Sequence, residues 1–152
     1  MLNQLKGVFS SFQKNEVKYI VIGGIASVLH GVPRATFDLD ILIEATPSNV
    51  RKLLTALEEA GLGTASLTSV EEVLNHEITI FKDRVRIDVQ TTTPGIEFDE
   101  VWGKRVTMAY QEQYFWVISK EDLIRSKKAS GRKVDLEDVH ILEVDDDEGR
   151  FK

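Results

Sequence analysis

The chain has 152 residues, of which 42% are hydrophobic, and carries a net charge of −6 with no cysteine. This length suits one compact domain with its own core, and the missing cysteines exclude a disulfide framework, a thiolate nucleophile and a cysteine zinc site. The negative charge argues against a protein that coats nucleic acid, which needs excess Lys and Arg. No stretch resembles a signal peptide or has the roughly 20 apolar residues of a membrane span, so we expect a cytoplasmic protein.

Apolar spacing and turn residues divide the chain into helices and short strands. In chain order, the expected elements are a helix over 2–15, a strand over 19–22, a helix over 25–30, a strand over 38–44, a helix over 47–61, a short helix that begins near Thr68, strands over 78–81 and 85–89, a hairpin of 106–110 and 114–118, and helices that begin near Ser119 and Asp135. We expect one domain over 1–144. The charged stretch over 145–152 is poor in apolar residues and predicts a disordered tail.

Two acids, Asp38 and Asp40, open the second predicted strand. One residue apart on a strand, they project from the same face with Cα atoms about 6.5 to 7 Å apart. Such a pair is costly to bury unless a cation neutralises it, and magnesium takes carboxylate oxygens together with water and phosphate oxygens. The alternative is structural: Asp38 caps a turn, and Asp40 pairs with Arg34 or Arg86.

A third acid, Asp88, lies between Ile87 and Val89 on a later predicted strand. Three acids on two strands predict a catalytic site in which two metal ions about 3.5 to 4 Å apart are bound by Asp38, Asp40 and Asp88. We expect Mg²⁺, with Mn²⁺ as a substitute, to activate an attacking hydroxyl on the Asp88 side and to neutralise the leaving phosphates. In the alternative, Asp88 faces solvent on an edge strand.

A glycine pair, Gly23-Gly24, lies between a predicted strand and helix, where backbone N–H groups can approach a phosphate. Alone, the pair could equally serve tight packing. Followed by Asp38-Leu39-Asp40 and by Asp88, it resembles the signature of the DNA polymerase beta-like nucleotidyltransferase superfamily. More narrowly, the chain is similar to small prokaryotic members related to minimal and toxin–antitoxin nucleotidyltransferases. That likeness covers most of the chain and rests on Gly23-Gly24-Ile25-Ala26, His30-Gly31, Arg34, Thr36, Lys127 and Gly131-Arg132.

The resemblance implies a nucleotidyltransferase fold of the α+β class, with a central mixed sheet flanked by helices and with further helices at the C-terminus. If the end of the first strand meets the start of the second at one site, these strands run antiparallel, whereas a strand–helix–strand unit is normally parallel. The implied activity is metal-dependent transfer of a nucleoside monophosphate from a nucleoside triphosphate to a hydroxyl of RNA, protein or a small molecule.

Four more residues are expected at the nucleotide, beside the glycine pair. Arg34 and Thr36 precede the first two acids, where a guanidinium can brace the triphosphate. The alternative for Arg34 is an ion pair with one of those acids. Lys127 and Arg132 match positions that the small prokaryotic nucleotidyltransferases retain. The alternative is structural, because cations near the end of a helix are also favoured by the helix dipole.

A second functional hypothesis keeps the fold without catalysis. Gly24 stands where many active members of the superfamily have Ser, so a hydroxyl donor to the phosphates is missing. The chain would then be a nucleotide-binding or antitoxin-like module that binds a partner protein. Metal-dependent binding of a triphosphate without turnover would support this alternative.

Overall fold

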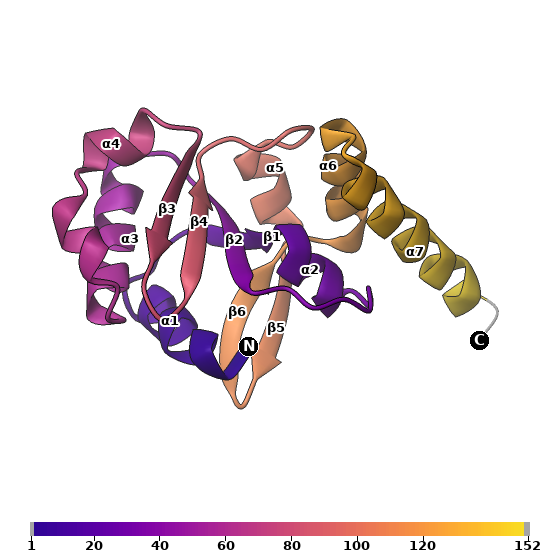
Figure 1. Cartoon of the computed structure of the whole chain (residues 1–152), viewed down its shortest axis with the longest axis horizontal. Helices are drawn as coiled ribbons and strands as arrows, with labels where there is room; N and C mark the ends of the chain where they lie inside the picture. Colours follow the sequence, from indigo (N-terminus) through magenta and orange to yellow (C-terminus); the bar gives the residue numbers. More distant parts are fainter. Residues whose placement is uncertain (1, 151–152) are drawn as a thin grey trace.

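Seven α-helices and one 3-10 helix flank a six-stranded sheet in the computed structural model, which describes residues 2–150 and their side chains through Val144 (Figure 1). The strands are β1 (Tyr19–Ile22), β2 (Asp38–Ile43), β3 (Ile78–Lys82), β4 (Arg86–Gln90), β5 (Val106–Tyr110) and β6 (Gln113–Val117). The helices are α1 (Leu2–Lys14), α2 (Gly23–Leu29), α3 (Pro47–Glu59), α4 (Val70–Leu74), α5 (Phe98–Gly103), α6 (Lys120–Ser130) and α7 (Lys133–Arg150), with the 3-10 helix at Gly63–Leu67.

The sheet is mixed and has the strand order β3-β4-β2-β1-β6-β5. Strands β1 and β2 run antiparallel, with Ile22 opposite Asp40, although α2 connects them. Strand β2 runs parallel to β4, with Asp40 opposite Asp88, and β1 runs parallel to β6. The α+β class, the mixed sheet and the antiparallel first pair are therefore confirmed.

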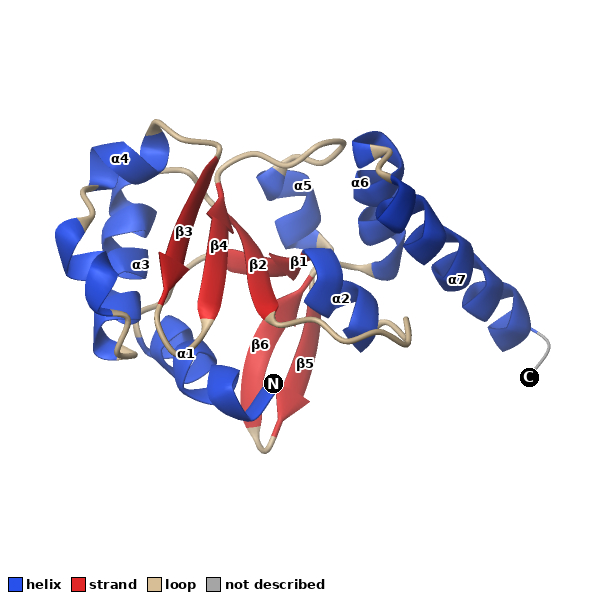
Figure 2. Ribbon diagram, in the orientation of Figure 1, coloured by secondary structure: helices blue, strands red, loops and turns tan. Residues whose placement is uncertain are grey.

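The core is formed by the sheet and by apolar residues of the helices that pack on it, among them Phe12 of α1, Ile25 of α2 and Leu123 of α6. Phe9 of α1 stacks on Phe115 of β6 with ring centroids 4.4 Å apart, and Leu53 of α3 is fully buried. Figure 2 shows α3 and α4 on one side of the sheet and α6 and α7 on the other. Helices α6 and α7 contribute buried charged residues on their side, among them Lys127 and Asp138, together with the apolar Leu123 and Leu142.

The expected elements are confirmed with small shifts at their ends. Helix α2 begins at Gly23, so the glycine pair forms the first turn of the helix and does not precede it. Helix α7 begins at Lys133, before the expected Asp135, because the Leu136 N–H already bonds to the Arg132 carbonyl over 3.0 Å. Helix α5 was not expected: Val101 is its one fully buried apolar residue, so it leaves no helical period in the sequence.

The expected tail over 145–152 lies beyond the described side chains. Backbone is described to Arg150, as part of α7. The boundary between domain and tail therefore stays a prediction.

No helix in the described part of the chain is both long enough and apolar enough to cross a membrane.

Candidate functional site

The three predicted acids lie on one face of the sheet, where β1 ends and β2 begins. Asp40 is the register partner of Ile22 on one side and of Asp88 on the other, and Asp38 lies one pleat earlier on β2. Leu39, between the two β2 acids, is fully buried. Because successive side chains of β2 point to opposite faces of the sheet, the two acids lie on one face and Leu39 lies on the other.

A cleft of about 330 Å³ opens over these acids. The predicted site residues that line it are Gly23, Asp38, Asp40, Asp88, Lys127 and Arg132. Three other predicted residues, Gly24, Arg34 and Thr36, are not part of its lining. Arg34 and Thr36 instead border a separate cavity of about 250 Å³ beside α2. The structure therefore brings the acids together with one glycine and two cations, Lys127 of α6 and Arg132 of the connection between α6 and α7.

Asp88 is held by an arginine of its own strand. Arg86 donates from Nε to Oδ1 of Asp88 over 2.9 Å and from Nη2 to Oδ2 over 3.2 Å. The same Nε lies 3.8 Å from Oδ2 of Asp38, the register partner of Arg86 on β2. Strand β3 covers the outer side of β4, so an exposed Asp88 on an edge strand is wrong. The alternative pairing of Arg86 with Asp40 is wrong as well, because Arg86 pairs with Asp88.

Asp40 receives no hydrogen bond and forms no ion pair with any described residue. Burial raises the pKa of its carboxyl to about 7, and the negative charges of Asp88 and Asp38 add to the rise. Arg86 and Lys127 act in the opposite direction without cancelling it. Asp40 thus keeps its proton up to near-neutral pH because burial and the two neighbouring acids disfavour its charged form, and an added cation would favour its ionised form.

The three acids suit a hard divalent cation in kind, because carboxylate oxygens are the ligands that Mg²⁺ and Mn²⁺ prefer. Their side chains do not yet converge: within residues 2–144, no three acids or histidines lie close enough to share one ion. Arg86 contributes to this, since it occupies both oxygens of Asp88. The donor set therefore fits the expected metal, and completing it requires side-chain movement at Asp88.

The glycine pair allows α2 to approach the acids closely. Gly23 has a φ of +70°, a conformation that favours glycine, and a Cβ added there would collide with the carboxylate of Asp40. A Cβ on Gly24 would lie 3.0 Å from Oγ1 of Thr36. Both glycines thus allow tight packing, Gly23 against Asp40 and Gly24 against Thr36. Gly23 in addition borders the cleft.

Lys127 is a fixed cation at the back of the cleft. Its Nζ lies 3.3 Å from Oδ1 of Asp135 and 3.0 Å from Oδ2 of Asp138, and its side chain is only 7% exposed. Arg132 binds Asp135 as well, over 2.8 Å, but is 74% exposed. Burial opposes ionisation of Asp135, yet hydrogen bonds from Arg132 and Ser130 outweigh it and lower its pKa. Helix α7 thus supplies the acids that hold both predicted cations.

Asp138 connects three separate parts of the chain. Its carboxylate is paired with Arg34 over 3.2 Å and accepts a hydrogen bond from Ser27 of α2 over 3.2 Å, in addition to its ion pair with Lys127. The expected alternative for Arg34, an ion pair with one of the β2 acids, is therefore wrong. Arg34 instead braces α2 against α7, behind the glycine turn.

Three residues that shape this site are absent from the set predicted from sequence: Arg86, Asp135 and Asp138. The signal for Arg86 is its place two residues before Asp88 on a strand, which puts both side chains on one face. The signal for the two α7 acids is their spacing of three residues on a helix, which makes them neighbours. Neither signal identifies the partner, because the partner comes from the packing of separate elements.

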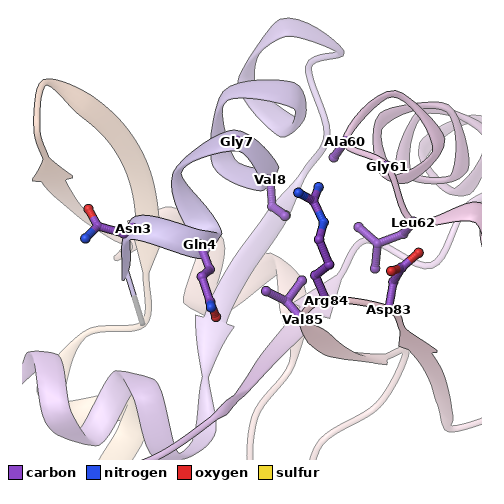
Figure 3. Close-up of a pocket in the computed structure, with 10 residues that line it drawn as sticks. All are labelled: Asn3, Gln4, Gly7, Val8, Ala60, Gly61, Leu62, Asp83, Arg84 and Val85. Atoms are coloured by element: carbon purple, nitrogen blue, oxygen red, sulfur yellow. The ribbon is translucent and has the colours of Figure 1, made fainter.

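A third cavity, of about 360 Å³, lies between α1, the end of α3 and the β3–β4 turn (Figure 3). Figure 3 shows Arg84 extending from this turn toward Ala60 and Gly61. None of the predicted site residues lines it. The guanidinium of Arg84 forms no hydrogen bond or ion pair with the residues that the structure describes, and the three acids lie elsewhere.

The fold and the cleft together define a nucleotidyltransferase-like protein: a mixed sheet, an antiparallel first strand pair, a glycine turn and acids at their junction. Residues 2–146 match the family described as "Nucleotidyltransferase of unknown function (DUF6036)", and the chain belongs to this family. A search of curated proteins gave no match. Membership supports nucleotidyl transfer as the function and a nucleotide as the substrate.

Proposed function

We propose that this chain is a metal-dependent nucleotidyltransferase of the DNA polymerase beta-like superfamily, which moves a nucleoside monophosphate from a nucleoside triphosphate to a hydroxyl acceptor. The acceptor is RNA, a protein or a small molecule. The observation that carries the proposal is the arrangement of Asp38, Asp40 and Asp88 on one face of adjoining strands, with Asp40 lacking a cationic partner.

Asp38, Asp40 and Asp88 would hold Mg²⁺, or Mn²⁺ in its place, most simply as two ions. Bound there, the metal would lower the pKa of an acceptor hydroxyl and neutralise the charge of the leaving phosphates. Asp88, on β4, lies farther from the glycine turn than Asp40 and would take the acceptor side. Asp40, between Asp88 and Ile22, would be the shared ligand.

The opposite end of the cleft would bind the nucleotide. Gly23 borders the cleft at the first turn of α2, where free N–H groups can approach phosphate oxygens. Arg132 lines the cleft with most of its side chain exposed, so it can reach a triphosphate without leaving a buried site. Gly24 and Thr36 would act through the packing of this turn, and Arg34 through its brace to α7.

Lys127 would contribute to the nucleotide site as a fixed positive charge. It lines the cleft, and its charge favours the ionised form of Asp40. The ion pairs to Asp135 and Asp138 hold its ammonium in place. A charge that is held before the substrate arrives needs no rearrangement when negative charge develops.

The test is transfer of label from α-labelled ATP, GTP, CTP or UTP, in the presence of Mg²⁺, to total RNA or total cell protein. We expect transfer by the wild type and a loss of at least about 100-fold in Asp88→Asn and Asp40→Asn, since each removes a ligand of the metal. Asp83→Asn is the matched control, because Asp83 is an exposed acid on the β3–β4 turn. Full transfer by Asp88→Asn would exclude this mechanism.

One observation favours a second candidate, a catalytically silent nucleotide-binding or antitoxin-like module. The Arg86–Asp88 pair neutralises one acid without any metal, and Gly24 offers no hydroxyl to the phosphates. Such a module would bind a triphosphate, or a partner protein such as a toxin, without transfer. Calorimetric binding of ATP and Mg²⁺ with no label transfer to any acceptor would support this candidate over the enzyme.

A further inference from the structure

The acid cluster contains a cation of its own. Arg86 binds Asp88 through two parallel hydrogen bonds, of 2.9 and 3.2 Å, which use both carboxylate oxygens. The fork of a guanidinium matches a carboxylate in this way, so the pair is well defined. Nε of Arg86, which donates the shorter of the two bonds, also lies 3.8 Å from Oδ2 of Asp38. Arg86 thus stands between the two outer acids of the proposed metal site.

We infer that Arg86 is an exchangeable counter-ion: it occupies Asp88 in the metal-free protein and must leave Asp88 before a divalent cation can be bound there. This inference rests on the proposed function, because it concerns the same three acids. It adds a residue that neither the glycine turn nor the acid motif contains, and it predicts how metal binding is controlled.

Arg86 and a divalent cation compete for the same oxygens. An ion bound to Asp88 while Arg86 stayed in place would have a full positive charge within a few ångströms, and like charges at that distance repel strongly. The fit of the guanidinium also fixes the orientation of the Asp88 carboxylate. This agrees with the finding that no three acids among the described residues converge on one point.

The exposure of Arg86 makes such an exchange feasible. Its side chain is 38% exposed, and its register partner on the edge strand β3, Lys82, is exposed as well. A partly exposed ion pair is worth little, because water solvates the released guanidinium. Lys127 is the opposite case, since it is enclosed by Asp135 and Asp138. The three acids therefore have one buried, fixed cation near them, Lys127, and one partly exposed cation, Arg86, that can leave.

Competition of this kind weakens the binding of metal alone. The apparent dissociation constant equals the intrinsic one divided by the fraction of molecules in which Asp88 is free. If Arg86 is paired in about ten molecules for each unpaired one, its removal tightens metal binding about tenfold. A triphosphate that arrives with its metal would offer the released guanidinium new oxygens, so metal and nucleotide should bind together.

The test is Mn²⁺ binding, followed by the electron paramagnetic resonance signal of the free ion, in the wild type, Arg86→Gln and Arg84→Gln. We expect Arg86→Gln to bind Mn²⁺ about tenfold more tightly than the wild type. Arg84→Gln is the matched control: it removes the same charge from a side chain on the neighbouring turn that has no described partner. We expect its affinity to stay within about twofold of the wild type, as for a screened surface charge.

A second measurement follows Arg86 directly and needs no variant. The Nε–H resonance of Arg86 in a ¹H–¹⁵N spectrum should shift or broaden when diamagnetic Mg²⁺ is added, because its hydrogen bond to Asp88 is lost. Arg86→Lys keeps the charge without the fork, so its Mn²⁺ affinity should lie between those of the wild type and Arg86→Gln.

The outcomes separate this inference from the proposed function. If the wild type binds Mn²⁺ and Arg86→Gln binds it no more tightly than Arg84→Gln does, Arg86 is no counter-ion, and the proposed function stands. An Arg86 resonance that is unchanged at saturating Mg²⁺ would exclude the counter-ion role in the same way. If neither the wild type nor Arg86→Gln binds Mn²⁺ at millimolar concentration, both the inference and the metal-dependent function are overturned.

Discussion

Asp40 and Asp88 are register partners on neighbouring parallel strands, so their carboxylates stand side by side on the cleft face of the sheet. Only Asp88 has a counter-ion, Arg86. The cost of this arrangement falls on Asp40, whose pKa rises to about 7 through burial first and through the charges of Asp88 and Asp38 second. Two adjacent acids therefore differ in their environment, one with a bound guanidinium and one without.

Asp40 should make the metal-free protein less stable as the pH rises. The pKa of Asp40 is about 7 in the folded protein, against an ordinary value of 3.8, so between pH 4 and 7 the unfolded chain loses a proton that the folded chain keeps. The free energy of unfolding then falls with rising pH, by at most about 1.4 kcal/mol per pH unit from this group. Above pH 7 this contribution is constant.

Asp40→Asn removes this dependence. In urea titrations without metal, its stability relative to the wild type should increase from pH 4 to pH 7 and then level off, because the amide cannot ionise. A difference that is independent of pH would show that Asp40 titrates normally.

Divalent metal should stabilise the wild type and not the acid variants. A ligand that binds only the folded state adds about 2.7 kcal/mol to the free energy of unfolding at 100 times its dissociation constant. Thermal melts with and without Mg²⁺ should show a rise for the wild type and for Asp83→Asn, whose substituted acid lies outside the cleft. Asp40→Asn and Asp38→Asn should show little or none. Equal rises in all four proteins would mean that Mg²⁺ binds elsewhere.

Gly23→Ala should be strongly destabilising for two separable reasons. A left-handed conformation costs an L-residue about 1 to 2 kcal/mol, and the added Cβ meets the Asp40 carboxylate. In an Asp40→Ala background the collision is gone, so the same substitution should cost only the conformational part. Chemical denaturation of the four proteins measures this coupling. Additive effects would show that the collision is relieved by movement.

Lys127 and Arg132 should differ sharply in their contribution to stability, although both pair with Asp135. Lys127→Met leaves Asp135 and Asp138 buried with fewer partners and should cost about 3 to 5 kcal/mol. Arg132→Met removes an exposed partner and should cost about 1 kcal/mol or less. Urea denaturation at pH 7 compares the two. Equal costs would mean that Lys127 is not the cation that holds α7 in place.

Much of the fold could be predicted from the sequence, because its strands have clear patterns. The alternation of Asp38, Leu39 and Asp40 is confirmed as a charged and an apolar face, and the glycine turn followed by acids required the antiparallel first pair that is observed. The short helix α5 was missed because one buried residue, Val101, gives no period.

The partners of the charged residues could be predicted less well. The sequence places Arg34 close to the β2 acids, yet its ion pair is with Asp138, which lies on the last helix. The sequence likewise does not show which of Asp38, Asp40 and Asp88 is the partner of Arg86, because all three acids lie on the same face of the sheet as Arg86. Such choices depend on how helices and strands pack, and local spacing does not contain that information.

The contacts of Asp138 also affect the order in which the chain can complete its cleft. During synthesis the N-terminal part of a protein emerges first, so β1, α2 and β2 are available long before α7. Ser27 and Arg34, however, have their carboxylate partner 111 and 104 residues further along the chain. A growing chain therefore carries its three acids without the helix that braces the glycine turn, and the cleft is complete only after α7 has been synthesised.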